Sequence, residues 1–223
     1  MALPPAKLPA FSGDDYLAWE AQQPGRSEYV AGEVFAMAGV EDRHACASLN
    51  LAMALRAELR GSPCRVYRSD VKLRVEAADA YFYPDVFVTC SPVDRADRLV
   101  KREAVLVAEV LSESTEAYDR GDKFAAYRQL PSLREVLFID IRRRAVDLYR
   151  IGDDGLWVLH PLLAGDALVL QSLGLTLAVE VLFDDLEDEP PVAAAGAGAP
   201  VETGMGASAG TAAGAGTDSA LER

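Results

Sequence analysis

Two acidic residues stand inside apolar runs of the sequence, where an isolated carboxylate is costly. Glu109 interrupts the run Val105 to Leu111, and Asp85 lies within the aromatic and β-branched run from Tyr81 to Val88. A buried carboxylate needs a hydrogen-bonding partner, an opposite charge or a metal ion. If both runs are strands of one sheet, Asp85 and Glu109 can converge on a single cation.

The types of ligand indicate which cation this site would bind. Carboxylate oxygens, without histidine or cysteine, are typical of Mg²⁺ or Mn²⁺ sites. An ion of this kind polarises a phosphoryl group and lowers the pKa of a bound water molecule. The two carboxylates therefore predict a Mg²⁺ or Mn²⁺ site suited to phosphodiester hydrolysis.

A third group with suitable chemistry follows in the sequence. Asp119, Lys123 and Tyr127 are spaced so that they share one face of a helix. If this helix packs against the strand that holds Glu109, Lys123 reaches the metal site and supports the nucleophile or the transition-state charge. Simpler interpretations remain open, because Pro84-Asp85 is a common turn dipeptide and Glu109 with Lys123 can form an ordinary buried ion pair.

Several segments together resemble the Uma-type restriction endonuclease family of the PD-(D/E)XK nuclease superfamily. The resemblance rests on YPDVFVTC, VAEVLSEST and DRGDKFAAYRQLPSLREVLFID, in that order, and on SEYVAGEVFAMAG and DLYR. It covers about residues 12 to 187, with Asp85 and Glu109 as metal ligands and Lys123 as the catalytic lysine. The motif's lysine is displaced onto the following helix, because Leu111 occupies its usual position.

The resemblance also places Glu33 and His44 near the site, as a further metal ligand and as a contact to substrate or water. Taken alone, Glu33 would be an exposed hairpin residue and His44 a helix cap. The implied activity is a Mg²⁺-dependent endonuclease that hydrolyses phosphodiester bonds of DNA. The alternative is a catalytically inactive protein of nuclease fold that acts as a binding or regulatory module.

The elements that must position these residues alternate between helix and strand. Periodicity predicts helices at 12–23, 42–60 and 118–130, and strands at 28–30, 33–37, 65–75, 81–89, 104–111, 135–141, 145–151 and 156–161, with further short strands to 183. This order predicts an α/β restriction-endonuclease-like sandwich. A mixed central sheet would be flanked by helices, with additional antiparallel strands.

Charge weighs against binding to nucleic acid, because the formal net charge of the chain is −13 and phosphate contacts usually need a basic surface. We predict one nuclease domain over residues 1–187 and a disordered, acidic Ala/Gly-rich tail over 188–223. The domain without the tail is still acidic. Basic residues gather at Arg65, Arg68, Lys72 and Arg74, and on one face of a strand they would form a basic groove.

The remaining features concern location and assembly. Cys46, Cys64 and Cys90 lack C-x-x-C spacing, which predicts reduced core residues rather than a disulfide framework or a zinc site. No run approaches the roughly 20 apolar residues of a membrane span, and the N-terminus lacks a secretory signal pattern, so we expect a cytoplasmic protein. We expect a homodimer, because a two-fold axis presents two sites to two antiparallel DNA strands.

Overall fold

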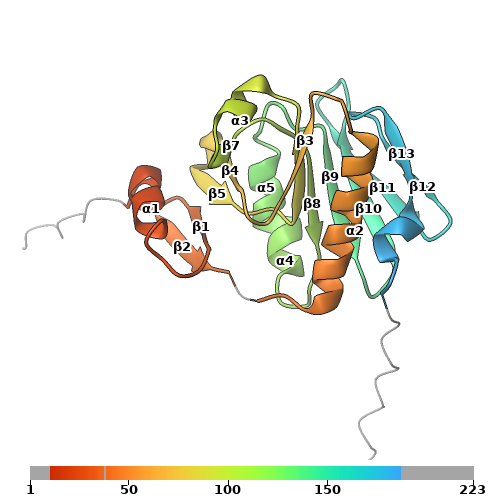
Figure 1. The fold of residues 1–223 in the computed structure, drawn as a ribbon, viewed down its shortest axis with the longest axis horizontal. Helices are drawn as coiled ribbons and strands as arrows, with labels where there is room; N and C mark the ends of the chain where they lie inside the picture. The colour runs from red at the N-terminus through yellow and green to blue at the C-terminus, as the bar shows by residue number, and fades with distance from the viewer. Residues whose placement is uncertain (1–10, 38, 187–223) are drawn as a thin grey trace, which may run out of the picture. The chain divides into compact units, whose positions relative to one another are not determined.

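The structure is a computed structural model that describes residues 11–37 and 39–186 (Figure 1). The predicted tail at 188–223 lies outside the described residues. Within the described part of the chain, no helix is both long enough and apolar enough to cross a membrane.

A mixed sheet of six strands forms the centre of the fold, and we call it the larger sheet. In spatial order its strands are β11 (Trp157–Leu163), β10 (Ala145–Ile151), β9 (Glu135–Asp140), β8 (Ala104–Val110), β6 (Val86–Thr89) and β3 (Arg65–Arg68). β8 and β9 are parallel, and every other neighbouring pair is antiparallel. The predicted mixed central sheet is confirmed.

Helices cover both faces of the larger sheet. Leu106, Ala108 and Val110 of β8 share a core with α2 (Asp42–Glu58), whereas Val107 packs in a second core with α5 (Phe124–Tyr127). Successive side chains of a strand point to opposite faces, so α2 and α5 lie on opposite sides of β8. Figure 1 shows α2 running along the strands. The side chain of Glu109 consequently points toward the α5 side.

A second sheet of five strands, which we call the smaller sheet, alternates along the chain with the first strands of the larger one. Its spatial order is β2 (Glu33–Ala36), β1 (Ser27–Val30), β5 (Ala80–Phe82), β4 (Lys72–Val75) and β7 (Val100–Lys101). Helix α1 (Gly13–Glu20) begins at Ser12 with the capping box that the Ser12 and Asp15 pattern indicates. The rings of Tyr16, Tyr29 and Tyr81 pack together between α1 and this sheet.

Two predicted strands are each divided between the sheets. The stretch 65–75 becomes β3 and β4, and the stretch 81–89 becomes β5 and β6. In the second case the break falls at Tyr83-Pro84-Asp85, because Pro84 has no N–H to donate to a ladder. The N–H groups on either side of Pro84 donate instead to carboxylates, that of Tyr83 to Glu28 and that of Asp85 to Glu109. The strand break therefore creates a junction lined by acidic side chains.

The remaining elements are short. They are η1 (Glu76–Ala78), α3 (Pro92–Ala96), α4 (Glu116–Tyr118), the π-helical turn η2 (Asp119–Lys123), β12 (Ala167–Leu170), β13 (Leu175–Ala178) and η3 (Val179–Phe183). β12 and β13 form an antiparallel hairpin. Glu135 of the larger sheet, which is fully buried, accepts hydrogen bonds from Arg150 and from Ser172 in the turn of this hairpin, and Arg150 also donates to the carbonyl of Val169.

The cysteine prediction is wrong in part, because Cys64 and Cys90 form a disulfide. The pairing of Arg65 with Thr89 in the β3–β6 ladder brings the two cysteines opposite each other at the end of these strands. Spacing along the sequence could not show this, since the two cysteines are 26 residues apart. Cys46 is free and half-buried.

Candidate active site

Asp85 and Glu109 are joined by reciprocal hydrogen bonds between neighbouring strands. The backbone N–H of Val110 donates to Asp85 Oδ2 at 2.8 Å, and the backbone N–H of Asp85 donates to Glu109 Oε2 at 3.3 Å. The antiparallel register, in which Val86 faces Ala108, sets up this exchange. The predicted convergence of the two carboxylates is therefore present in the structure.

Glu109 is 2% exposed and is held from the helix side. Its Oε1 accepts a hydrogen bond of 2.5 Å from the Tyr127 hydroxyl and one of 3.2 Å from Lys123 Nζ. Both donors lie on the helical segment that we expected to pack against this strand. The segment reaches Glu109 because Phe124 and Tyr127 are packed into the core on that face of the larger sheet.

The helical segment is not a regular α-helix where it meets Glu109. Residues Asp119–Lys123 form a π-helical turn, in which the backbone N–H of Phe124 donates to the carbonyl of Asp119. Such turns occur mostly as single insertions in α-helices and are frequent at functional sites. Lys123 faces the strand, because its Nζ contacts Glu109, and the buried Asp119 lies beside it with Oδ1 3.5 Å from Nζ.

A carboxylate that we did not predict completes the cluster. Glu28 in β1 is buried, and its Oε1 accepts a hydrogen bond from the backbone N–H of Tyr83 and lies 3.2 Å from Lys123 Nζ. Glu33, the predicted residue, is exposed in β2 and shares no hydrogen bond or ion pair with these groups among the described residues. We call Glu28, Asp85, Glu109 and Asp119 the carboxylate cluster.

The hairpin explains why Glu28 is buried in the cluster and Glu33 is exposed. Both residues flank the turn at Ala31-Gly32, but β1 lies inside the smaller sheet between β2 and β5, whereas β2 is at its edge. Side chains of an interior strand are more often buried. The signal that could have found Glu28 is its place beside Tyr29 and Val30, since a glutamate in a buried strand needs a partner.

His44 lies in the first turn of α2 and approaches the cluster from the other face of the larger sheet. Its Nε2 is 3.1 Å from Asp85 Oδ2, and its Nδ1 is buried without a hydrogen-bonding partner among the described residues. Burial on its own would lower the pKa of His44, but the hydrogen bond and charge of Asp85 raise it above the usual value. The structure therefore brings His44 to Asp85.

The cluster holds more acids than bases, and this perturbs its titration. Burial raises the pKa of Glu109 to about 8, opposed by the charge of Lys123 and assisted by that of Asp85. Burial also raises the pKa of Asp119. For Lys123, burial would lower the pKa, but Glu109 and Glu28 hold it well above its ordinary value. The ammonium stays charged, and protonation of Glu109 relieves the repulsion among the acids.

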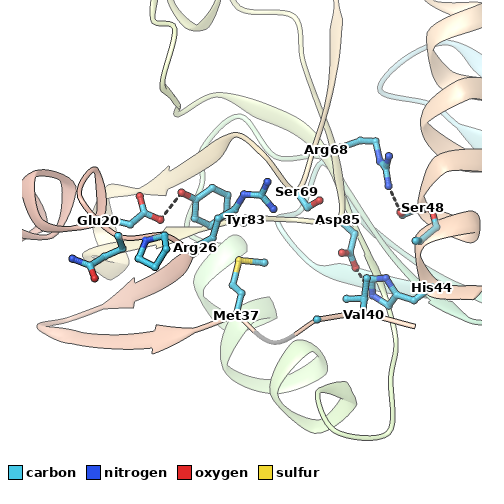
Figure 2. A pocket seen from close by; sticks show the side chains of 15 residues that line it. Glu20, Arg26, Met37, Val40, His44, Ser48, Arg68, Ser69, Tyr83 and Asp85 are labelled. Carbon is cyan, nitrogen blue, oxygen red and sulfur yellow. Dashed lines mark hydrogen bonds and ion pairs between the residues drawn. The ribbon is translucent and has the colours of Figure 1, made fainter. Parts of the chain in front are cut away.

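A pocket of about 590 Å³ opens beside Asp85. Figure 2 shows Asp85, His44, Arg68 and Ser48 around one part of it and Glu20 and Tyr83 around another. The Asp85 side chain is 15% exposed, whereas Lys123 and Glu109 are buried and do not line the pocket. A ligand in this pocket would meet Asp85 and His44 first, with Glu109 and Lys123 behind them.

Known proteins with similar sequences include two uncharacterized proteins of Synechocystis sp. The first, slr1290, is 39% identical over 183 residues, which cover 82% of this chain and 96% of that protein. The second, sll1609, is 33% identical over 155 residues, which cover 69% of this chain and 88% of that protein. The similarity therefore extends over most of each relative.

A crystal structure of "a putative nuclease belonging to DUF820" from Anabaena variabilis has the same fold. Its TM-score is 0.63 at 14% identity, over 76% of this chain and 96% of that one. A family model matches residues 14–181, which include every member of the carboxylate cluster, Lys123 and His44. The chain therefore belongs to the family described as "Uma2: Putative restriction endonuclease".

Proposed function

We propose that this protein is a Mg²⁺- or Mn²⁺-dependent endonuclease that hydrolyses phosphodiester bonds of DNA. The observation that carries the proposal is the exchange of hydrogen bonds between Asp85 and the Glu109 strand, next to a buried Lys123 and an open pocket. Membership of a family described in terms of restriction endonucleases supports this class of reaction.

Asp85 and Glu109 are the residues that would hold the cation. Asp85 Oδ1 accepts no hydrogen bond within the described residues, and Glu109 Oε2 accepts a single one, so each carboxylate keeps acceptor capacity. In this part of the chain, no three His, Cys, Asp or Glu side chains are grouped closely enough to hold an ion by themselves. Two protein ligands suit Mg²⁺, which is commonly bound by one or two carboxylates together with water and substrate phosphate.

The bound cation would supply the polarisation of the phosphoryl group and the acidification of a water molecule. The chain's own residues orient the ligands. Lys123 and Tyr127 both donate to Oε1 of Glu109, which leaves Oε2 on the side of Asp85. These contacts support a positioning role for Lys123, and its predicted contact with the nucleophile or the transition state stays a prediction.

His44 lines the pocket together with Asp85. Its raised pKa means that a proton remains on the imidazole to higher pH than usual. This proton is held between Nε2 and Asp85 Oδ2, at the pocket wall. Nε2 is therefore occupied by Asp85, and the contact to substrate or water that the family resemblance implies for His44 stays a prediction.

The alternative is a catalytically inactive protein of nuclease fold. One observation favours it: Lys123 Nζ lies among Glu28, Glu109 and Asp119 and is screened from the pocket. An ammonium that is occupied by carboxylates cannot contact a scissile phosphate without moving. Metal binding must therefore be measured separately from cleavage.

The decisive experiment measures nicking of supercoiled plasmid with Mg²⁺, with Mn²⁺ and with EDTA, and cleavage of a labelled RNA under the same conditions. We expect metal-dependent nicking of DNA that is lost in Asp85→Asn and Glu109→Gln. Glu33→Gln is the matched control, because it makes the same chemical change on an exposed strand outside the cluster, and it should cut like the wild type.

Each outcome has a definite meaning. Cleavage of RNA but not of DNA would correct the substrate. A wild type that cuts neither nucleic acid and binds no Mn²⁺ in calorimetry would refute the proposal and support the inactive alternative. Loss of activity in Glu33→Gln, with Asp85→Asn still active, would show that the metal ligands are assigned wrongly.

A further inference from the structure

Arg68 stands out among the residues that line the pocket beside Asp85. It is the last residue of β3 and pairs with Val86 of β6, the residue after Asp85. Both Arg68 and Asp85 line the pocket, with Ser48 and His44 of α2 close by (Figure 2). A guanidinium group therefore lies next to the predicted metal ligand, on the solvent side of the carboxylate cluster.

The Arg68 side chain is held in place without its charge being neutralised. Its Nη2 donates to Ser48 Oγ at 2.7 Å, and the Ser48 hydroxyl is itself fixed by the carbonyl of Ala45 at 3.0 Å. Its Nε is buried and has no acceptor among the described residues. A buried donor without an acceptor is costly, and the guanidinium keeps donor capacity that the described residues do not use.

Other basic residues around the pocket are neutralised. Arg26 also lines it but is paired with Asp70, and the imidazole of His44 is paired with Asp85. Among the residues described, no carboxylate pairs with Arg68. Of the basic residues that the sequence groups as a possible groove, Lys72 is bound to Glu20 and Arg74 to Asp79. Arg68 is the member of this group that lines the pocket.

We propose that Arg68, braced by Ser48, binds a phosphate group of the nucleic-acid backbone in the pocket beside Asp85. A guanidinium group offers several donors in a planar fork that matches phosphate oxygens. The proposal deepens the proposed nuclease function and rests on it for the identity of the ligand. It also answers the objection from charge, because a single unneutralised arginine makes the pocket locally attractive to an anion in an acidic protein.

The test measures DNA binding in EDTA, where no cleavage can occur. A fluorescein-labelled DNA duplex and a labelled single strand are titrated with protein by fluorescence anisotropy over a series of salt concentrations. For Arg68→Ala we expect an affinity about tenfold weaker and a salt slope for the duplex smaller by about 0.9. Arg68→Lys keeps the charge but not the fork, so it should keep the salt slope while losing affinity.

Arg26→Ala is the matched control, since it removes the same charge from the same pocket. Because Arg26 is already paired with Asp70, its loss should change the affinity by less than about twofold. Thermal melting of each variant verifies that it is folded. Equal affinities and slopes for wild type and Arg68→Ala, or equal losses in the two alanine variants, would overturn the proposal.

Two further outcomes separate this proposal from the nuclease function. DNA binding that depends on Arg68, in a protein that cuts nothing with Mg²⁺ or Mn²⁺, would support the phosphate site and refute the catalytic assignment. Metal-dependent cleavage by the wild type, with unchanged DNA binding by Arg68→Ala, would support the catalytic assignment and refute the phosphate site. Calorimetry with inorganic phosphate tests whether the site binds free phosphate instead. If the protein binds phosphate but neither the duplex nor the single strand, the assignment to nucleic acid is overturned. If it binds neither phosphate nor DNA, the proposal is overturned as well.

Discussion

Replacement of Lys123 by methionine tests the electrostatics of the cluster most directly. The change keeps the length of the side chain but removes a buried ammonium that lies 3.2 Å from both Glu28 and Glu109. Removal of one partner of a buried ion pair typically costs about 3–5 kcal/mol. At about 2–4 °C per kcal/mol for a domain of this size, we expect the melting temperature of the metal-free protein to fall by about 10 °C.

The loss should depend on pH in a definite direction. The folded-state pKa of Glu109, about 8, is above its ordinary value of 4.5, so protonation of Glu109 stabilises the fold at low pH and this contribution is lost as pH rises through 8. Without the charge of Lys123 the pKa of Glu109 rises further. Methionine at position 123 should therefore cost less stability at pH 6 than at pH 9, as measured by scanning calorimetry in EDTA.

Two control variants test whether the loss comes from the buried charge of Lys123. Arg142→Met breaks an ion pair with Glu113 in which both side chains are substantially exposed, and it should cost less than about 1 kcal/mol. The double variant Lys123→Met with Glu109→Gln removes one of the carboxylates that lose their partner, so it should recover part of the loss. A Lys123→Met protein that melts like the wild type at both pH values would show that Lys123 is not held in a buried ion pair.

Two further predictions concern the metal and the disulfide. Burial raises the pKa of Glu109, and a metal ion binds the carboxylate form, so Mn²⁺ binding should release protons near neutral pH and fewer protons as the pH rises. Calorimetry in buffers of different ionisation enthalpy measures this release, and Glu109→Gln should reduce it. Cys64→Ala should lower the free energy of unfolding by about 2–4 kcal/mol under oxidising conditions, because it opens a long loop. Urea denaturation measures this difference. Equal stabilities of the oxidised wild type and the variant would contradict the prediction.

Local patterns predicted the helices and the general class of the fold well. The expected helix at 42–60 is α2, and the mixed sheet with flanking helices is confirmed. These features depend on the spacing of apolar residues and on caps, which act over a few residues. The contact between Lys123 and Glu109 also followed from local spacing, once the helix was assumed to pack on its strand.

Features that depend on contacts between distant segments could not be predicted in this way. Pro84 marked a possible turn, but the transfer of the chain from one sheet to the other there is decided by how the sheets pack. Whether Glu28 or Glu33 is buried depends on which strand of the hairpin is at the edge of the smaller sheet. The Cys64–Cys90 disulfide likewise depends on the pairing of β3 with β6. The homodimer stays a prediction.

An ordinary buried ion pair is not a sufficient account of this site. It would explain Glu109 with Lys123, and Glu28 could be added as a second partner of the ammonium. Asp85 is different, because it forms no ion pair with Lys123 and instead lies at the pocket wall with His44. Neutralising a buried lysine does not require a further carboxylate that raises the pKa of Glu109. Asp85 thus brings a carboxylate of the cluster to the pocket wall, where a divalent ion shared with Glu109 would relieve the repulsion between the two acids.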